Sequence, residues 1–206
     1  MGSLQSTLQN HWDSVYMAEK QFSWFQPYPN TSMEFVELFQ LPKDAHIIDI
    51  GGGDSQFVDA LLDKGYQNIY VLDISAQAIE RAKQRLGPAS SKVNWIVADV
   101  TEFIPPVQFD FWHDRAAFHF LTTEDKIYKY VSIAEHAIRK NGYLVLGTFS
   151  EKGPEKCSGL EVKQYSAASM SARFELAFDR IKCIQEDHKT PFNTVQNFLF
   201  CSFRKR

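Results

Sequence analysis

The sequence contains 206 residues, of which 22 are Lys or Arg and 25 are Asp or Glu, and its formal net charge is −3. This length fits one domain with a sizeable hydrophobic core. The pI near 6.1 argues against a dedicated nucleic-acid-binding protein, because such proteins carry a basic face. No apolar stretch is long enough to span a bilayer and the N-terminal residues lack the pattern of a signal peptide, so we expect a cytoplasmic protein without membrane contacts.

The first 43 residues are rich in aromatic side chains and are predicted to form a helical cover. The spacing of Thr31 and Glu34 is that of a capping box, which predicts a helix over residues 32–40, before Pro42. The aromatic side chains of this cover either close over a ligand or pack a helix against a sheet, and we favour the first role. They are Trp12, Tyr16, Phe22, Trp24, Phe25 and Tyr28.

Strand and helix signals alternate along residues 44–148. Short apolar runs predict strands at residues 47–50, 69–72, 93–97, 109–112 and 143–148. Helical spacing between them predicts helices that begin at Asp54 or Ser55, at Ser75 and at Thr122. This alternation predicts an α/β fold with a doubly wound, mostly parallel sheet covered by helices on both faces.

The last part of the chain, residues 149–206, follows a different pattern. A helix is predicted over residues 167–178, followed by strands at 180–185 and 195–203. The short connection between these strands predicts an antiparallel hairpin, because a parallel pair needs a long crossover. We therefore predict a single domain of residues 1–206, with a cover (1–43), a core (44–148) and a substrate-side loop and hairpin (149–206).

Three cysteines, Cys157, Cys183 and Cys201, are distributed without close spacing. An odd number in this arrangement predicts neither a disulfide framework nor a zinc site, and it suits a reducing cytoplasm. No other metal site is expected. The loop at residues 150–162 is rich in turn-forming residues and is expected to wall a substrate pocket, which would bring Cys157 close to that pocket.

The glycine-rich loop after the first predicted strand indicates a nucleotide ligand. Gly51 and Gly53 fill the first two positions of a dinucleotide-binding G-x-G-x-x-G pattern, but Gln56 stands at the third. Asp54 lies beside the start of the next helix, where its carboxylate would repel a pyrophosphate. The loop therefore favours a ligand without phosphates, and especially one that carries a positive charge.

S-adenosylmethionine is a ligand of this kind, and three acidic residues stand where predicted strands end. Asp49 lies in the first strand, Asp73 ends the second and Asp99 ends the third. The carboxyl ends of such strands border one ligand crevice, so Asp73 is expected to bind ribose hydroxyls and Asp99 an adenine amino group. The alternative is that Asp73 and Asp99 only cap the turns that follow them.

Four ordered segments, "DIGGGDS", "VLDIS", "VADV" and "AIRKNGYLVLGTF", resemble the motifs of class I, seven-stranded S-adenosylmethionine-dependent methyltransferases. The resemblance runs from about Trp12 to Phe203 and departs from the usual pattern at Ser55, where the family has glycine. It implies a seven-stranded sheet whose last strand is antiparallel. It also implies a cofactor pocket built from Trp24, Asp49, Gly51, Gly52, Gly53, Asp73, Ile74, Asp99, Val100 and Arg115.

The candidates for the reaction itself lie in the segment that follows the fourth predicted strand. His113 and Asp114 stand at its end, and His119 lies about one helical turn beyond Arg115. Each of the three could orient a methyl acceptor or take its proton. The alternative is that Asp114 and Arg115 form an ion pair that shapes the turn, while His119 packs beneath the sheet.

The acceptor is indicated by the same segment. "DRAAF" is similar to a segment of thiopurine and thiol methyltransferases, whereas the Asn/Asp-Pro-Pro-Tyr motif of enzymes that act on DNA bases or glutamine is absent. We therefore expect a small-molecule acceptor, with a thiol or another heteroatom. One alternative is a protein-lysine N-methyltransferase, because the aromatic N-terminal segment is also similar to that of such enzymes. The other is a non-catalytic scaffold that only binds the cofactor. The oligomeric state is left open.

Overall fold

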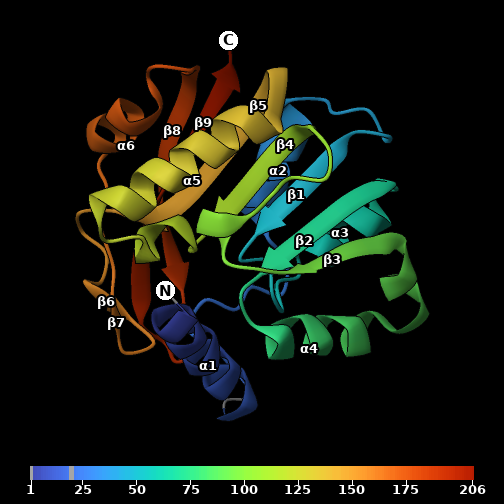
Figure 1. Ribbon diagram of the computed structural model, residues 1–206, viewed down its shortest axis with the longest axis vertical. Coiled ribbons are helices and arrows are strands. Elements are labelled where there is room, and N and C mark those ends of the chain that lie inside the picture. The colour runs from blue at the N-terminus through green and yellow to red at the C-terminus, as the bar shows by residue number, and fades with distance from the viewer. Residues whose placement is uncertain (1, 19–20) are drawn as a thin grey trace.

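A seven-stranded β-sheet organises the residues that the computed structural model describes, which are 2–18 and 21–206. Its strand order is β3-β2-β1-β4-β5-β9-β8 (Figure 1). The first five strands of the chain run parallel to one another, whereas β9 is antiparallel to β5 and β8 is antiparallel to β9. The strands are β1 (His46–Ile50), β2 (Asn68–Asp73), β3 (Val93–Val97), β4 (Phe109–Arg115), β5 (Ile138–Phe149), β8 (Phe178–Lys189) and β9 (Val195–Lys205).

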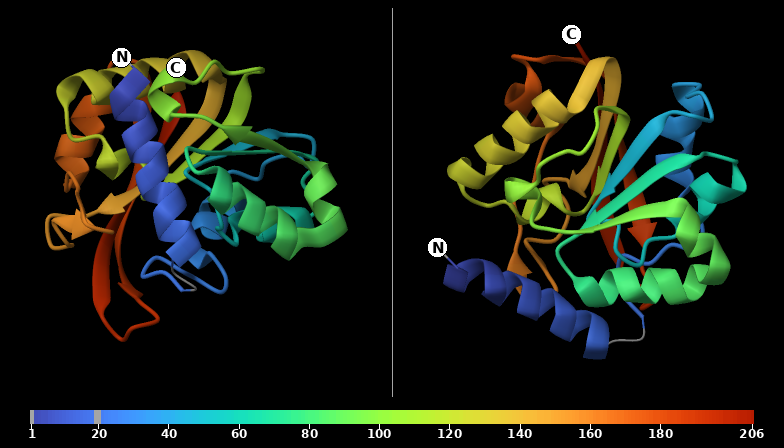
Figure 2. Two further views of the ribbon diagram at one scale, coloured as in Figure 1. Left: turned by 60° about the horizontal axis from the view of Figure 1, so that its bottom comes forward. Right: turned by 45° about the vertical axis from the view of Figure 1, so that its right-hand side comes forward.

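Helices cover both faces of the sheet, and this confirms the predicted fold class. The helices α5 and α6 pack on one face and α2 and α3 on the other, while α1 lies across the carboxyl ends of the parallel strands, beside α4 (Figures 1 and 2). Short 3₁₀ helices and a two-residue β-pair complete the connections. The bounds are α1 (Gly2–Ala18), α2 (Asn30–Leu38), α3 (Phe57–Asp63), α4 (Ala76–Leu86), α5 (Glu124–Ala137), α6 (Ala167–Phe174), η1 (Gly87–Lys92), η2 (Val100–Glu102), η3 (Phe118–Phe120), β6 (Lys156–Cys157) and β7 (Leu160–Glu161).

Two hydrophobic clusters fill the space between the sheet and its helices. Trp112 and Tyr130 belong to the cluster under α5 and α6, and Trp112 Nε1 donates to the Tyr130 hydroxyl over 2.9 Å. Phe57 and Phe111 belong to the cluster under α2 and α3. Both faces of the strands are therefore buried, which explains why the parallel strands read as continuous apolar runs.

Local signals predicted some element ends correctly and others not. Ser75 caps α4 as expected, with its hydroxyl accepting from the backbone N–H of Ala78. The capping box predicted at Thr31 does not form, because the Thr31 hydroxyl donates to Glu186 on β8 and α2 begins at Asn30. The helix predicted over residues 167–178 ends at Phe174, and Phe178 instead begins the pairing of β8 with β9.

The hairpin of β8 and β9 also holds the segment that follows α1. His188 Nε2 donates to the backbone oxygen of Ser23 over 2.8 Å, and Gln196 Nε2 donates to the Ser23 hydroxyl over 3.3 Å. The carboxyl end of the chain thus fixes the position of the aromatic cover. Among the described residues, no helix combines the length and the apolar character that crossing a bilayer requires.

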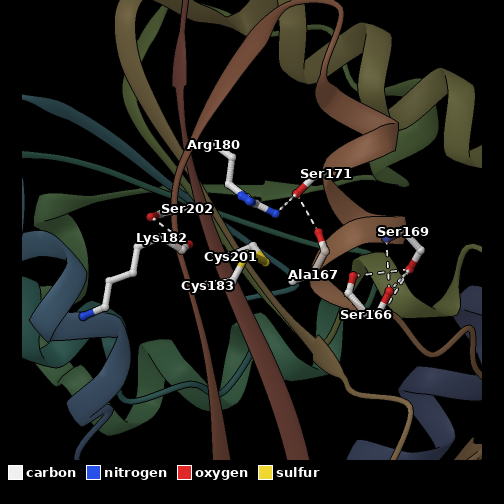
Figure 3. The surroundings of a disulfide bond; sticks show 9 residues. All are labelled: Ser166, Ala167, Ser169, Ser171, Arg180, Lys182, Cys183, Cys201 and Ser202. Carbon is white, nitrogen blue, oxygen red and sulfur yellow. Dashed lines mark hydrogen bonds between the residues drawn. A yellow bond between two sulfur atoms is a disulfide. The ribbon is translucent and has the colours of Figure 1, made fainter.

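The expectation of a chain without disulfides is wrong, since Cys183 and Cys201 are joined by a disulfide bond (Figure 3). The two residues stand directly opposite each other in the β8–β9 pair, and their Cα atoms are 4.1 Å apart. Their separation of 18 residues gave no sign of the bond, because it depends on the register of two strands. Cys157 is buried and takes no part in the disulfide.

Reduction of this disulfide is expected to lower the free energy of unfolding by about 2–4 kcal/mol, because the bond restricts the unfolded chain. Urea unfolding of the protein with and without a reductant measures the difference. The Cys183→Ser variant should show the lower stability in both conditions, whereas Cys157→Ser should keep the dependence on reductant. An intact mass with three free thiols under oxidising conditions would contradict this expectation.

Candidate functional site

A pocket opens at the carboxyl ends of the parallel strands, beneath α1. Its empty space, open mouth included, is about 790 Å³. Strand ends and the loops after them form one wall, and the aromatic cover forms the other. Seven residues that were predicted to bind the cofactor line it, namely Trp24, Gly51, Asp73, Ile74, Asp99, Val100 and Arg115.

The glycine loop after β1 packs against two carboxylates. Gly51 has a φ of +64°, a conformation that glycine adopts without strain. A Cβ atom at Gly52 would come within 2.5 Å of Asp49 Oδ2, and one at Gly53 within 2.6 Å of Asp73 Oδ2. Gly52 and Gly53 are therefore needed for the close approach of the loop to Asp49 and Asp73, although neither lines the pocket.

Asp73 is a buried acid at the end of β2 and on the pocket wall. Its Oδ1 accepts from the backbone N–H of Ser75 over 2.8 Å. Burial is the largest cause that raises the pKa of Asp73, to about 7, and the charge of Asp49 adds to this effect. Near neutral pH the carboxyl is thus held between its two protonation states and would be stabilised as a carboxylate by hydroxyl donors from a ligand.

Asp99 combines the two roles that were considered for it. Its Oδ1 accepts from both the backbone N–H and the hydroxyl of Thr101, each over 2.8 Å, and so caps η2. The same residue lines the pocket next to Val100. Capping of the turn therefore holds the carboxyl group in place at the pocket wall.

His113 and Asp49 are neighbours across the β1–β4 pair and form a buried polar chain below the loop. His113 Nδ1 lies 2.7 Å from Asp49 Oδ1, and its Nε2 lies 2.8 Å from the hydroxyl of Ser32 on α2. Asp49 Oδ2 has no hydrogen-bond partner among the described residues. His113 borders a second, smaller pocket, which Trp24 and Arg115 also line.

Asp114 lies behind the pocket wall, and its oxygens are occupied by protein donors. Oδ1 accepts from the backbone N–H groups of Ala117 and Phe118, and Oδ2 accepts from the hydroxyl of Tyr130 over 2.7 Å. Burial raises the pKa of Asp114 to about 6, although these hydrogen bonds oppose the rise. The ion pair with Arg115 that was considered as an alternative is not formed, because Asp114 instead holds the turn between β4 and η3.

His119 is fully buried and does not reach the main pocket. Its Nδ1 accepts from the backbone N–H of Phe149 over 3.3 Å, and its ring packs against the rings of Phe120 and Phe149. Burial, with a smaller contribution from the charge of Arg115, lowers the pKa of His119 to about 3. The imidazole is therefore neutral at physiological pH and is a weak base.

The sequence did not single out several residues of the pocket wall. Leu8 of α1 and Phe120 of η3 line the pocket, as does Cys157 of β6, which the loop at residues 150–162 was expected to bring close to it. Ala117 lines it as well, and a Cβ at Gly51 would lie only 2.6 Å from the Cβ of Ala117. Two consecutive alanines after Arg115 were the one signal available, since small side chains leave room at a strand end. Within the described parts of the chain, no three His, Cys, Asp or Glu side chains lie close enough to hold a metal ion.

The family model described as a methyltransferase domain matches residues 47–142, the segment that contains β1 to β4 and the glycine loop. Residues 47–142 are therefore similar to methyltransferase domains. The class I methyltransferase architecture that the motifs predicted is confirmed, because the sheet order, the antiparallel C-terminal strands and this domain agree. The finer similarity to thiopurine and thiol methyltransferases stays a prediction.

Curated relatives of the methyltransferase domain differ in their acceptors. The chain is 32% identical over 82 residues to EEF1A lysine methyltransferase 2 of Mus musculus, a match that covers 34% of this chain and 33% of that protein. It is 29% identical over 113 residues to malonyl-[acyl-carrier protein] O-methyltransferase 1 of Ilyobacter polytropus, with 53% of this chain and 40% of that protein covered. The chain thus spans well under half the length of either relative in these matches.

Solved structures match nearly the whole chain in fold. A structure solved for the conversion of a disulfide bond into a thioacetal group during echinomycin biosynthesis has a TM-score of 0.76 at 17% identity, covering 96% of this chain and 92% of that one. N-methyltransferase NodS from Bradyrhizobium japonicum, solved with S-adenosyl-L-homocysteine, has a TM-score of 0.68 at 16% identity, with 93% and 95% covered. At these identities the similarity concerns the fold.

Replacement of Asp114 by Ala is expected to reduce the free energy of unfolding by about 2–4 kcal/mol, because it leaves the Tyr130 hydroxyl and two backbone N–H groups without their acceptor. Thermal or urea unfolding measures the loss. Asp114→Asn keeps one acceptor oxygen and should lose less. A stability of Asp114→Ala equal to that of the unmodified protein would contradict the structural role assigned to this carboxyl.

Proposed function

We propose that the protein is an S-adenosylmethionine-dependent methyltransferase whose cofactor lies in the pocket at the carboxyl ends of β1 to β4. The observation that carries this proposal is the placement of Asp73 and Asp99 on one pocket wall, beside Gly51. Asp73 would accept from the ribose hydroxyls and Asp99 from the adenine amino group, with Ile74 and Val100 against the adenosine. The methyltransferase domain and the relative solved with S-adenosyl-L-homocysteine support the same cofactor.

The residues of the cover would hold the reacting groups together and exclude water. S-adenosylmethionine supplies a methyl group on a cationic sulfur, which leaves as a neutral thioether. Trp12 packs edge-on against Trp24 and Phe120, with ring centroids 6.0 and 5.0 Å apart. Because these rings border the pocket beneath α1, they would keep the displacement in a dry environment and align the acceptor with the methyl group.

The side chains that line the pocket favour an acceptor that is already nucleophilic. Burial raises the pKa of Tyr16 well above its ordinary value, so its hydroxyl stays protonated. His113, Asp114 and His119 are engaged behind the pocket wall, and we propose that they position the strand ends and do not transfer the acceptor's proton. A small molecule with a thiol or another heteroatom that loses its proton readily fits such a site.

The cytoplasmic location stays a prediction.

Two other functions are tested by the same measurements. Methylation of a protein lysine is supported by the relative that is 32% identical over 82 residues. Against it, the buried cation of Arg115 would repel a lysine ammonium in the pocket, and α1 covers the acceptor end of that pocket. A scaffold that only binds the cofactor would have the same adenosine contacts and no turnover.

As the pH increases towards 7, the affinity for S-adenosyl-L-homocysteine is expected to increase about tenfold per pH unit. Above pH 7 the affinity should no longer change with pH. The sign follows from Asp73, whose pKa of about 7 in the free protein would fall when ribose hydroxyls donate to it, so that binding releases a proton. Asp73→Asn should lose this pH dependence and bind at least about tenfold more weakly at pH 8. Calorimetry at several pH values measures both effects.

The matched control in this series is NAD, which should not bind because it brings a pyrophosphate to an acidic loop.

The fold of Asp73→Asn is checked by thermal unfolding. At pH 8 this variant should melt no lower than the parent protein, because ionisation of a carboxyl whose folded pKa is raised costs stability above the unfolded pKa of about 4. Binding of NAD in place of S-adenosyl-L-homocysteine would reverse the assignment of the pocket.

Release of S-adenosyl-L-homocysteine is expected with small thiols or other readily ionised heteroatom acceptors and not with protein lysines. The assay compares thiols, amines, carboxylates and candidate proteins, each with S-adenosylmethionine and the unmodified enzyme. The Asp73→Asn variant provides the background rate. Turnover only with a protein would favour the lysine methyltransferase, and cofactor binding without turnover on any acceptor would favour the scaffold.

A further inference from the structure

Arg115 is the last residue of β4 and stands between the two pockets. It lines the main pocket together with Gly51 and Cys157, and it lines the smaller pocket together with His113. Trp24 borders both spaces as well. The guanidinium could thus contact a ligand that extends from the adenosine end of the main pocket towards His113. It could also contact an acceptor that is bound under the cover.

The hydrogen bonds of Arg115 leave one edge of its guanidinium unused. Nη1 donates to the backbone oxygen of Trp24 over 2.9 Å. The nitrogens Nε and Nη2 are shielded from solvent and have no hydrogen-bond partner among the described residues. These two N–H groups point to the same side of the planar guanidinium and form the pair that binds the two oxygens of a carboxylate.

No acid of the described chain forms an ion pair with Arg115. The negative charges of Glu186 and Asp49 act on Arg115 and raise its pKa, but neither carboxylate is bonded to it. Asp49 Oδ1 contacts His113, and Glu186 accepts from the hydroxyl of Thr31. The guanidinium carbon Cζ lies over the ring of Phe198, 4.8 Å from its centroid. Burial lowers the pKa of Arg115 to about 10, which still leaves it protonated at neutral pH.

A buried cation with two unused donors is costly unless an anion completes it. The anion must fit a planar pair of N–H groups in a pocket that already contains Asp73 and Asp99, and a doubly charged phosphate would be repelled there. A single carboxylate satisfies both requirements, because it is planar, carries one charge and accepts two parallel hydrogen bonds.

We propose that Arg115 binds the carboxylate of a molecule held in the pocket, through Nε and Nη2. This inference rests on the proposed function, because that function names the two sources of such a group. One is the amino-acid end of the cofactor, and the other is a methyl acceptor that is itself a carboxylic acid. In the second case Arg115 determines the substrate class and selects small anionic acceptors.

The test compares the parent protein with Arg115→Gln by calorimetry, using two adenosine thioethers as probes. S-adenosyl-L-homocysteine carries the carboxylate, and 5′-methylthioadenosine lacks the whole amino-acid end. If the cofactor provides the carboxylate, the variant should lose about tenfold to a hundredfold in affinity for the first probe and keep its affinity for the second. An equal loss for both probes would overturn the proposal, since it would show a general disturbance of the pocket.

If the acceptor provides the carboxylate, the variant should bind S-adenosyl-L-homocysteine as the parent does. Benzoate and mercaptoacetate are then titrated into both proteins saturated with that probe, and at least one should bind the parent about tenfold or more tighter than the variant. No difference between the two proteins in either experiment would overturn the proposal. If the parent protein binds neither of the two adenosine probes, the proposed function itself is contradicted.

Two further variants separate recognition from folding. Arg115→Lys keeps the charge and loses the paired donors, so it should recover only part of the carboxylate affinity. Arg180→Gln removes an exposed guanidinium near the start of β8 that donates to Ser171, and this variant should bind all probes as the parent does. Arg115→Gln should unfold at a temperature no lower than the parent, whereas a merely structural arginine would leave a destabilised protein with unchanged relative affinities.

Discussion

The contact between a glycine loop and two buried carboxylates is the constraint on which the rest of the site depends. Gly52 and Gly53 leave no room for a Cβ atom beside the oxygens of Asp49 and Asp73. This close packing excludes water from both acids and raises the pKa of Asp73. The fold thus maintains unfavourable burial of negative charge at the carboxyl ends of β1 and β2, which a ligand with hydroxyl donors or positive charge would relieve.

Successive residues at the end of β4 have different tasks because side chains alternate between the two faces of a strand. His113 points towards α2 and contacts Ser32 and Asp49, whereas Asp114 points to the opposite face and contacts Tyr130 on α5. Arg115 returns to the side of Phe198. Sequence reasoning placed all three near the reaction but could not divide them in this way, since the division depends on which helix covers which face.

The sheet and the pocket acids were predictable because their signals are local. Apolar runs, a serine cap at Ser75 and an acid at each strand end are visible within a few residues of sequence. Features created by the register of distant strands were not. The disulfide of Cys183 with Cys201 and the loss of the Thr31 cap to Glu186 both depend on β8. His119 looked like a catalytic residue, and only its burial between Phe120 and Phe149 shows a neutral, packed imidazole.

The hydrogen bonds from His188 and Gln196 to Ser23 join the β8–β9 hairpin to the segment that follows α1. The cover and the hairpin are consequently bonded to each other, although the entire core separates them in the sequence. A chimera that exchanges the first 43 residues with those of a relative would keep the bond from His188, which ends on a backbone oxygen, but would lose the bond from Gln196 wherever residue 23 has no hydroxyl. Recombination that replaces the cover is therefore expected to preserve both bonds when the hairpin comes from the same parent.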